Sequence, residues 1–122
     1  MIRLKRGEMA ENVEELIAQY RDLLVQRSME FARPSVANKL FDRNHAIHKI
    51  LRESDEGRRA ISGLMNDDVD AVRLTAAVHT LQWDPVAAEH VLEDIEAGPG
   101  IVGFNAKWTL REYRDGKLDL DW

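Results

Sequence analysis

Four histidines are the first residues in this sequence that could do chemistry, because imidazole binds metal ions and acts as a general base near neutral pH. His45 and His48 lie three residues apart, which is a ligand spacing on a helix. A stable metal site needs three or four ligands, and no HExxH motif supplies them. We therefore interpret this pair as solvated, expect His79 and His90 at the surface, and predict that the chain binds no metal or other cofactor.

Acidic residues are the second candidates, since paired carboxylates can act as general acid and base. One segment carries four of them, at Glu89, Glu93, Asp94 and Glu96. Their spacing puts them on the polar side of an amphipathic helix, so we favour a solvated face. The sequence also has no cysteine, no Gly-rich phosphate loop and no Gly-x-Ser-x-Gly motif. We predict no catalytic residues and a protein that is not an enzyme.

The charge balance restricts the partners. Lys and Arg number 17 against 22 Asp and Glu, a formal net charge of −5, which disfavours binding to duplex nucleic acid. Residues 1–61 carry 12 basic and 10 acidic side chains, whereas residues 62–122 carry 5 and 12, so the C-terminal half could attract a basic partner. No segment approaches the roughly 20 apolar residues of a membrane span. We expect no membrane association and a cytoplasmic location.

Apolar residues at helical spacing predict about six helices. Asn12 and Glu15 resemble a capping box that starts the first, leaving residues 1–11 as a flexible N-terminus. Pro34 starts the second, in which Asn44 lies within the apolar stripe and needs a hydrogen-bond partner if it is buried. Ser54 is the expected cap of the third helix.

The C-terminal half shows the same kind of helix signals. An acidic turn at residues 67–70 precedes the fourth helix, and Asp84-Pro85 supplies the cap and first residue of the fifth. We expect the sixth helix to start near Gly103 and to end at Asp115-Gly116. Residues 117–122 alternate polar and apolar side chains, which predicts an extended tail.

Residues 57–82 resemble a HEAT repeat: a short helix, an acidic turn, then Val72-Arg73 followed by Ala76-Ala77. The resemblance implies that a turn acid contacts the Arg, and that the small alanines let two helices approach closely. Over residues 12–117 the chain is also similar to a family of short bacterial proteins known as a domain of unknown function. That likeness lies in a Val-Arg-x-x-Ala-Ala helix and in Gly-Phe-Asn-Ala at 103–106, followed by Thr-Leu-Arg-Glu from Thr109.

These features together predict an all-α fold. We expect a short HEAT-like array of antiparallel helical hairpins, about six helices in all, forming a single domain over residues 1–122. Of the three tryptophans, Trp83 and Trp108 are expected in the core, and Trp122 remains a candidate for an interface.

The second helices of stacked hairpins line the inner surface of a repeat array, so their remaining polar positions define the predicted binding strip. The strip consists of Thr75, His79, Gln82, Lys107, Arg111 and Arg114. We expect it to be exposed and to contact an acidic or polar segment of a protein partner. The predicted function is therefore a non-catalytic protein-binding module, such as a bacterial immunity or adaptor protein. The alternatives are a small helical-repeat enzyme acting through this strip and a structural homodimer.

Overall fold

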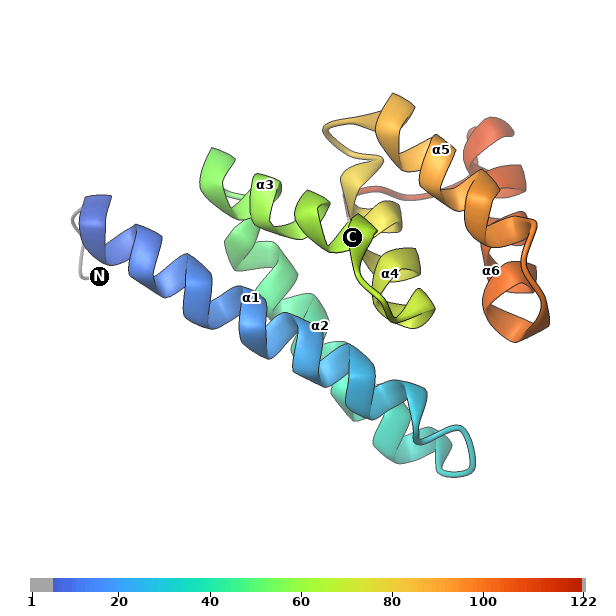
Figure 1. The fold of residues 1–122 in the computed structure, drawn as a ribbon, viewed down its shortest axis with the longest axis horizontal. Helices are drawn as coiled ribbons and strands as arrows, with labels where there is room; N and C mark the ends of the chain where they lie inside the picture. Colours follow the sequence, from blue (N-terminus) through green and yellow to red (C-terminus); the bar gives the residue numbers. More distant parts are fainter. Residues whose placement is uncertain (1–5, 122) are drawn as a thin grey trace. The chain divides into compact units, whose positions relative to one another are not determined.

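Six α-helices and one 3-10 turn make up the chain in the computed structural model, which describes residues 6–121 and the side chains from Asn12 onward (Figure 1). In chain order they are α1 (Arg6–Ser28), α2 (Pro34–Leu51), α3 (Asp55–Gly63), η1 (Leu64–Asn66), α4 (Asp70–Thr80), α5 (Pro85–Glu96) and α6 (Gly100–Arg114). The described residues contain no β-strand, so the all-α prediction is confirmed. Among these helices none is both long and apolar enough to cross a lipid bilayer.

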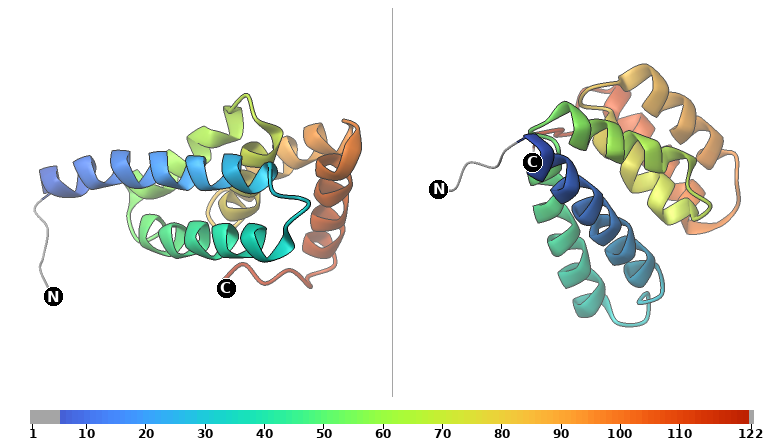
Figure 2. Two further views of the ribbon diagram at one scale, coloured as in Figure 1. Left: turned by 90° about the horizontal axis from the view of Figure 1, so that it is seen from below. Right: turned by 60° about the vertical axis from the view of Figure 1, so that its left-hand side comes forward.

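The chain divides into two compact units, Met1–Ile61 and Ser62–Trp122, with the boundary inside α3. In the first unit α1 and α2 lie side by side as an antiparallel hairpin (Figure 2). In the second unit α5 packs against both α4 and α6. Each unit thus buries the apolar faces of its helices against sequence neighbours.

The α1–α2 hairpin encloses one buried polar contact. Asn44 and Tyr20 are both wholly buried, and the Asn44 side-chain Nδ2 donates a hydrogen bond of 2.9 Å to the Tyr20 carbonyl oxygen. The amide nitrogen of Asn44 therefore has a hydrogen-bond partner, whereas its buried Oδ1 accepts no hydrogen bond within the described residues. Around it the hairpin core contains Leu23, Leu24, Leu40 and Leu51.

Three of the predicted helix ends are confirmed. The Ser54 Oγ accepts a hydrogen bond of 3.0 Å from the Gly57 amide at the start of α3. Asp84 accepts one of 3.4 Å from the Ala87 amide at the start of α5. Gly116, with φ of +71°, follows the last turn of α6 in the left-handed conformation that glycine adopts without strain.

Two predicted helix starts are wrong. α1 begins at Arg6, so Asn12 lies inside the helix and residues 6–11 are helical; the first five residues of the predicted flexible terminus lie outside the described part. The stretch before Asn12 is rich in good helix formers, which explains why the helix continues through a residue that resembles a cap. α6 begins at Gly100, directly after Pro99, and so before the expected start.

The turn before α4 has the contact that the HEAT resemblance implies. Arg73 forms an ion pair of 3.2 Å with Asp70, and its Nε donates a hydrogen bond of 3.1 Å to the Met65 carbonyl oxygen. A second ion pair of 3.0 Å joins Arg73 to Asp94 on α5. Hydrogen bonds to these two acids raise the pKa of the Arg73 guanidinium, which therefore stays charged and fastens the turn to α5.

Ala76 and Ala77 are both wholly buried on α4, as small residues at a close helix approach should be. Replacing Ala76 with leucine should overpack this contact and lower the free energy of unfolding by roughly 1 to 3 kcal/mol. Urea melts of Ala76→Leu and of the exposed control Ala46→Leu would measure the effect. Equal stability of the two variants would show that α4 has room at Ala76.

The C-terminal tail over residues 117–121 belongs to no helix and pairs with no strand among the described residues, and it bends at Leu120. Leu118 and Leu120 are half-buried, whereas Asp119 and Asp121 are exposed. The alternation thus separates buried from exposed side chains as the sequence indicates. Trp122, the remaining candidate anchor, lies outside the described residues.

Candidate interaction surface

The structure separates the six residues of the predicted binding strip. Thr75 and His79 are buried, with 9% and 3% of their surfaces exposed, so the prediction of one exposed strip is wrong for both. α4 is buried on several sides at once, which leaves it no broad polar face for them to occupy. The other four members are exposed, namely Gln82, Lys107, Arg111 and Arg114.

The outward face of α6 carries a stripe of large apolar side chains that the sequence reading did not single out. Ile101, Phe104 and Trp108 have 69%, 54% and 44% of their surfaces exposed. The face that α6 buries is formed by Gly103, Ala106 and Leu110. At about 100° per residue the two sets lie on opposite sides of the helix. Trp108 is therefore a surface residue, and the prediction that it fills the core is wrong.

Neighbouring side chains of this stripe contact one another through their rings. The Phe104 and Trp108 rings meet edge to face with centroids 6.0 Å apart. One helical turn further on, the Arg111 guanidinium lies 5.0 Å from the centre of the Trp108 ring, as a cation–π contact. We call Ile101, Phe104, Trp108 and Arg111 the α6 stripe.

A surface hollow of about 290 Å³ lies next to the stripe. Its lining consists of Glu96, Lys107, Leu110, Arg111, Arg114 and Asp115. Three of these side chains are cationic and two are anionic, around a single buried leucine. Three members of the predicted strip, Lys107, Arg111 and Arg114, thus line the hollow.

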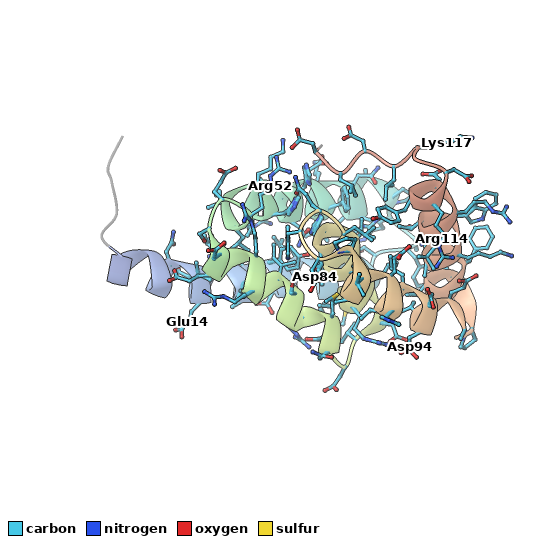
Figure 3. All side chains as sticks on the ribbon, turned by 90° about the horizontal axis from the view of Figure 1, so that it is seen from above. Glu14, Arg52, Asp84, Asp94, Arg114 and Lys117 are labelled. Carbon is cyan, nitrogen blue, oxygen red and sulfur yellow. The ribbon has the colours of Figure 1, made fainter. Side chains whose placement is uncertain are left out.

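The cations of α6 differ in how far they are already neutralised. Arg114 (labelled in Figure 3) forms ion pairs with Glu93 at 2.8 Å and with Glu89 at 3.4 Å on α5. Within the described chain no carboxylate lies at ion-pair distance from Lys107 or Arg111. Arg114 therefore holds α6 against α5, and the other two cations remain available to a partner.

Trp83 has a structural role in the second unit. Its ring is half-buried, and its Nε1 donates a hydrogen bond of 2.9 Å to the Ser62 hydroxyl, which lies 3.1 Å from the Thr80 hydroxyl. This chain of hydrogen bonds ties the end of α3 to the end of α4. Trp83 therefore lies at the edge of the core and does not fill it, although the sequence had led us to expect that it would.

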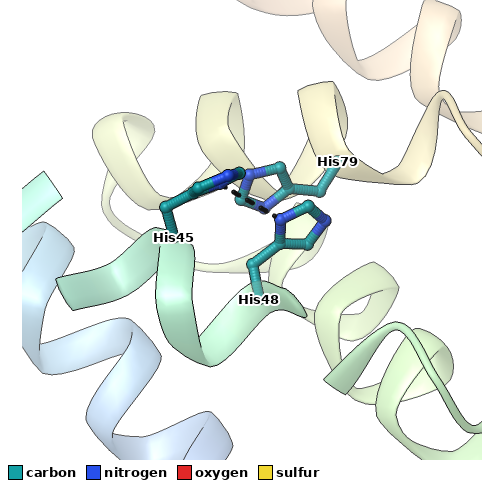
Figure 4. Close-up of side chains that lie close together, drawn as sticks. All are labelled: His45, His48 and His79. Carbon is teal, nitrogen blue, oxygen red and sulfur yellow. Dashed lines mark hydrogen bonds between the residues drawn. The ribbon is translucent and has the colours of Figure 1, made fainter. Parts of the chain in front are cut away.

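His45 and His48 lie one turn apart on α2, and Figure 4 shows their rings turned toward each other. The two Nδ1 atoms are 3.4 Å apart, and the ring centroids are 5.3 Å apart. His48 is buried and His45 half-buried, so the interpretation of two solvated histidines is wrong, because α2 places both rings toward packed regions. His79, expected at the surface, is buried, whereas His90 is exposed as predicted.

Burial makes His48 a pH-sensitive element of the fold. Burial, followed by the positive charges of Arg52 and then His45 and Lys49, lowers the pKa of His48 from 6.5 to about 4. The neutral ring therefore stabilises the native state above pH 6.5, and this contribution is lost as the pH falls toward 4. We expect it to amount to at most about 3 kcal/mol.

The test compares the free energy of unfolding of wild type and His48→Gln between pH 7 and pH 4. Carboxylates titrate in both proteins, so the difference between the two curves reports His48. We expect the curves to converge as the pH falls. Parallel curves would show that His48 is not held neutral by the fold.

The fold and the surface together describe an all-helical protein. It has an exposed aromatic stripe with unpaired cations beside it. No protein-family model matches the sequence, and no curated protein matches it either. Among solved structures, the chain is similar to the crystal structure of the protein RPA1889 from Rhodopseudomonas palustris CGA009. The two share 26% sequence identity with a TM-score of 0.83, over 96% of this chain and 98% of the other. This likeness supports the all-helical fold.

Proposed function

We propose that the chain is a non-catalytic protein-binding module and that the α6 stripe is its contact surface. The observation that carries the proposal is the exposure of Ile101, Phe104 and Trp108 on the side of α6 opposite its buried face. Large apolar side chains grouped on an otherwise polar surface mark interaction sites in soluble proteins.

The residue types of the stripe and the packing of α6 against α5 favour this function. Tryptophan and arginine are enriched among the residues that contribute most to protein interfaces, and here Arg111 packs on Trp108. α6 itself is fixed to α5 through the ion pairs of Arg114, so a partner would meet a preformed surface. A bacterial immunity or adaptor protein in the cytoplasm is the concrete form that we propose, built as a HEAT-like array.

Affinity capture from a bacterial lysate tests the proposal when wild type is compared with Phe104→Ser/Trp108→Ser. The matched control is Met29→Ser/Phe31→Ser, which removes two exposed apolar side chains from the loop between α1 and α2. We expect at least one protein to be retained by wild type and by the control but lost with the α6 variant. Retention that is unaffected by the α6 variant, or no specific retention at all, would contradict the proposal.

A further inference from the structure

The α6 stripe has the residue spacing of a helix-pairing seam. The four residues of the stripe, followed by Asp115 directly after the end of α6, lie at intervals of three, four, three and four residues. Such alternation is the a–d pattern by which one helix packs along another. All five positions lie within an arc of about 80° on the helix surface, and each residue is exposed. The seam is therefore continuous along α6.

Charges flank this seam asymmetrically. Lys107 and Arg114 lie along one edge, at the positions called g in a heptad. Asn105 and Glu112 lie along the other edge, at the e positions. The charge of Arg114 is already paired with α5, so Lys107 on this edge and Arg111 in the seam are the cations that a partner would meet.

A second copy of the chain fits this surface poorly. In a parallel pair of α6 helices each seam residue faces itself, which brings Arg111 against Arg111 and Asp115 against Asp115. In an antiparallel pair each edge faces its own copy, which brings the edge of Lys107 against itself and the edge of Glu112 against itself. Like charges that face each other oppose association, so both orientations are disfavoured.

We propose that the occupant of the α6 stripe is an amphipathic helix of another protein, with an apolar seam and acidic residues along its flank. Its apolar side chains would cover Ile101, Phe104 and Trp108, and its carboxylates would pair with Lys107 and Arg111. This inference rests on the proposed function and specifies the chemistry of the partner. The second unit as a whole carries 5 basic and 12 acidic side chains, so attraction of an acidic helix depends on these local cations.

The test uses two fluorescein-labelled peptides of 21 residues, with leucine at the seam positions and alanine on the outer face. One carries glutamate and the other lysine along the flank that faces Lys107, and both carry alanine along the flank that faces Glu112, so the two peptides differ only in the side chains of one flank. Fluorescence anisotropy titrations with the full-length chain measure both dissociation constants at low and at high salt. We expect the glutamate peptide to bind at least tenfold more tightly at low salt, and the difference to shrink as salt screens the charges.

Charge reversal should invert this preference. Lys107→Glu/Arg111→Glu is expected to bind the lysine peptide more tightly than the glutamate peptide. The matched control is Lys39→Glu/Arg43→Glu, which reverses two exposed cations at the same four-residue spacing on α2 and should leave the preference unchanged. Phe104→Ser/Trp108→Ser should weaken both peptides at least tenfold.

Several results would overturn the inference. They are equal affinity for the two peptides, no binding of either peptide, and a control variant that changes the preference as much as the α6 variant does. Sedimentation equilibrium can give one more such result. If wild type is a dimer and Phe104→Ser/Trp108→Ser is a monomer, the occupant of the stripe is a second copy of the chain. If capture depends on the stripe but the peptides show no charge preference, this inference fails while the proposed function stands.

Discussion

Replacing Gly57 with alanine should destabilise the first unit by about 3 kcal/mol or more. Gly57 lies in the first turn of α3, where that helix passes directly over the last residue of α2. A Cβ at this position would overlap the Leu51 carbonyl oxygen and would lie 2.6 Å from its carbonyl carbon and 2.8 Å from its Cα. These are backbone atoms, so no side-chain rotation can relieve the clash, and α3 must move away from α2.

Gly63→Ala is the matched control, because Gly63 belongs to the same helix and a Cβ there meets nothing within 4 Å. Alanine is the better helix former, so the control should be neutral or stabilised by up to about 1 kcal/mol. Urea denaturation followed by circular dichroism gives both values. A Gly57→Ala protein as stable as the control would mean that the α2–α3 approach is looser than described.

The Asn44→Asp variant should lose about 3 to 5 kcal/mol of stability at neutral pH. It replaces the amide donor that faces the Tyr20 carbonyl oxygen by a second acceptor, in a place where both residues are wholly buried. The folded state would disfavour the ionised form and raise the pKa of the new carboxyl. The loss should therefore shrink as the pH falls toward the ordinary carboxyl value, because a protonated Asp can donate to the carbonyl.

Asn44→Leu serves as the comparison, since it keeps the branching at Cγ and removes the hydrogen bond without adding a charge. At pH 7 Asn44→Leu should lose less stability than Asn44→Asp. Its loss should not shrink as the pH falls, because leucine does not titrate. Chemical denaturation of both variants at pH 7 and pH 4 measures the difference. A constant gap between them would show that the new carboxyl reaches solvent.

Helix ends were predictable because they depend on local chemistry. Ser54 and Asp84 cap their helices through side-chain oxygens within three residues of the amides they satisfy, and such signals are complete in the sequence. The start of α1 was not predictable in the same way. Asn12 and Glu15 have the residue types of a capping box, but only the conformation of the preceding backbone decides whether a helix begins there.

The candidate surface on α6 was only half predictable, because periodicity does not say which neighbours cover a helix. Most residues of α4 are small, and the helix is buried on several sides. Thr75 and His79 are therefore covered, although they lie outside the apolar stripe of this helix. On α6 the sequence holds two apolar stripes, one through Leu110 and one through Trp108. The smaller residues face inward and the aromatic ones outward, against the general preference for burying large rings. The three- and four-residue spacing of Ile101, Phe104 and Trp108 was the signal in the sequence for this exposed apolar face, which we propose as the contact surface.

Hydroxyl-radical footprinting of the captured complex tests most directly whether the α6 stripe is the contact surface. Oxidation of the exposed rings of Phe104 and Trp108 is measured by mass spectrometry with and without the retained partner, and Phe31 serves as the exposed reference. We expect oxidation of Phe104 and Trp108 to slow several-fold on binding, while that of Phe31 stays unchanged. Unchanged oxidation of both α6 rings in the complex would contradict it.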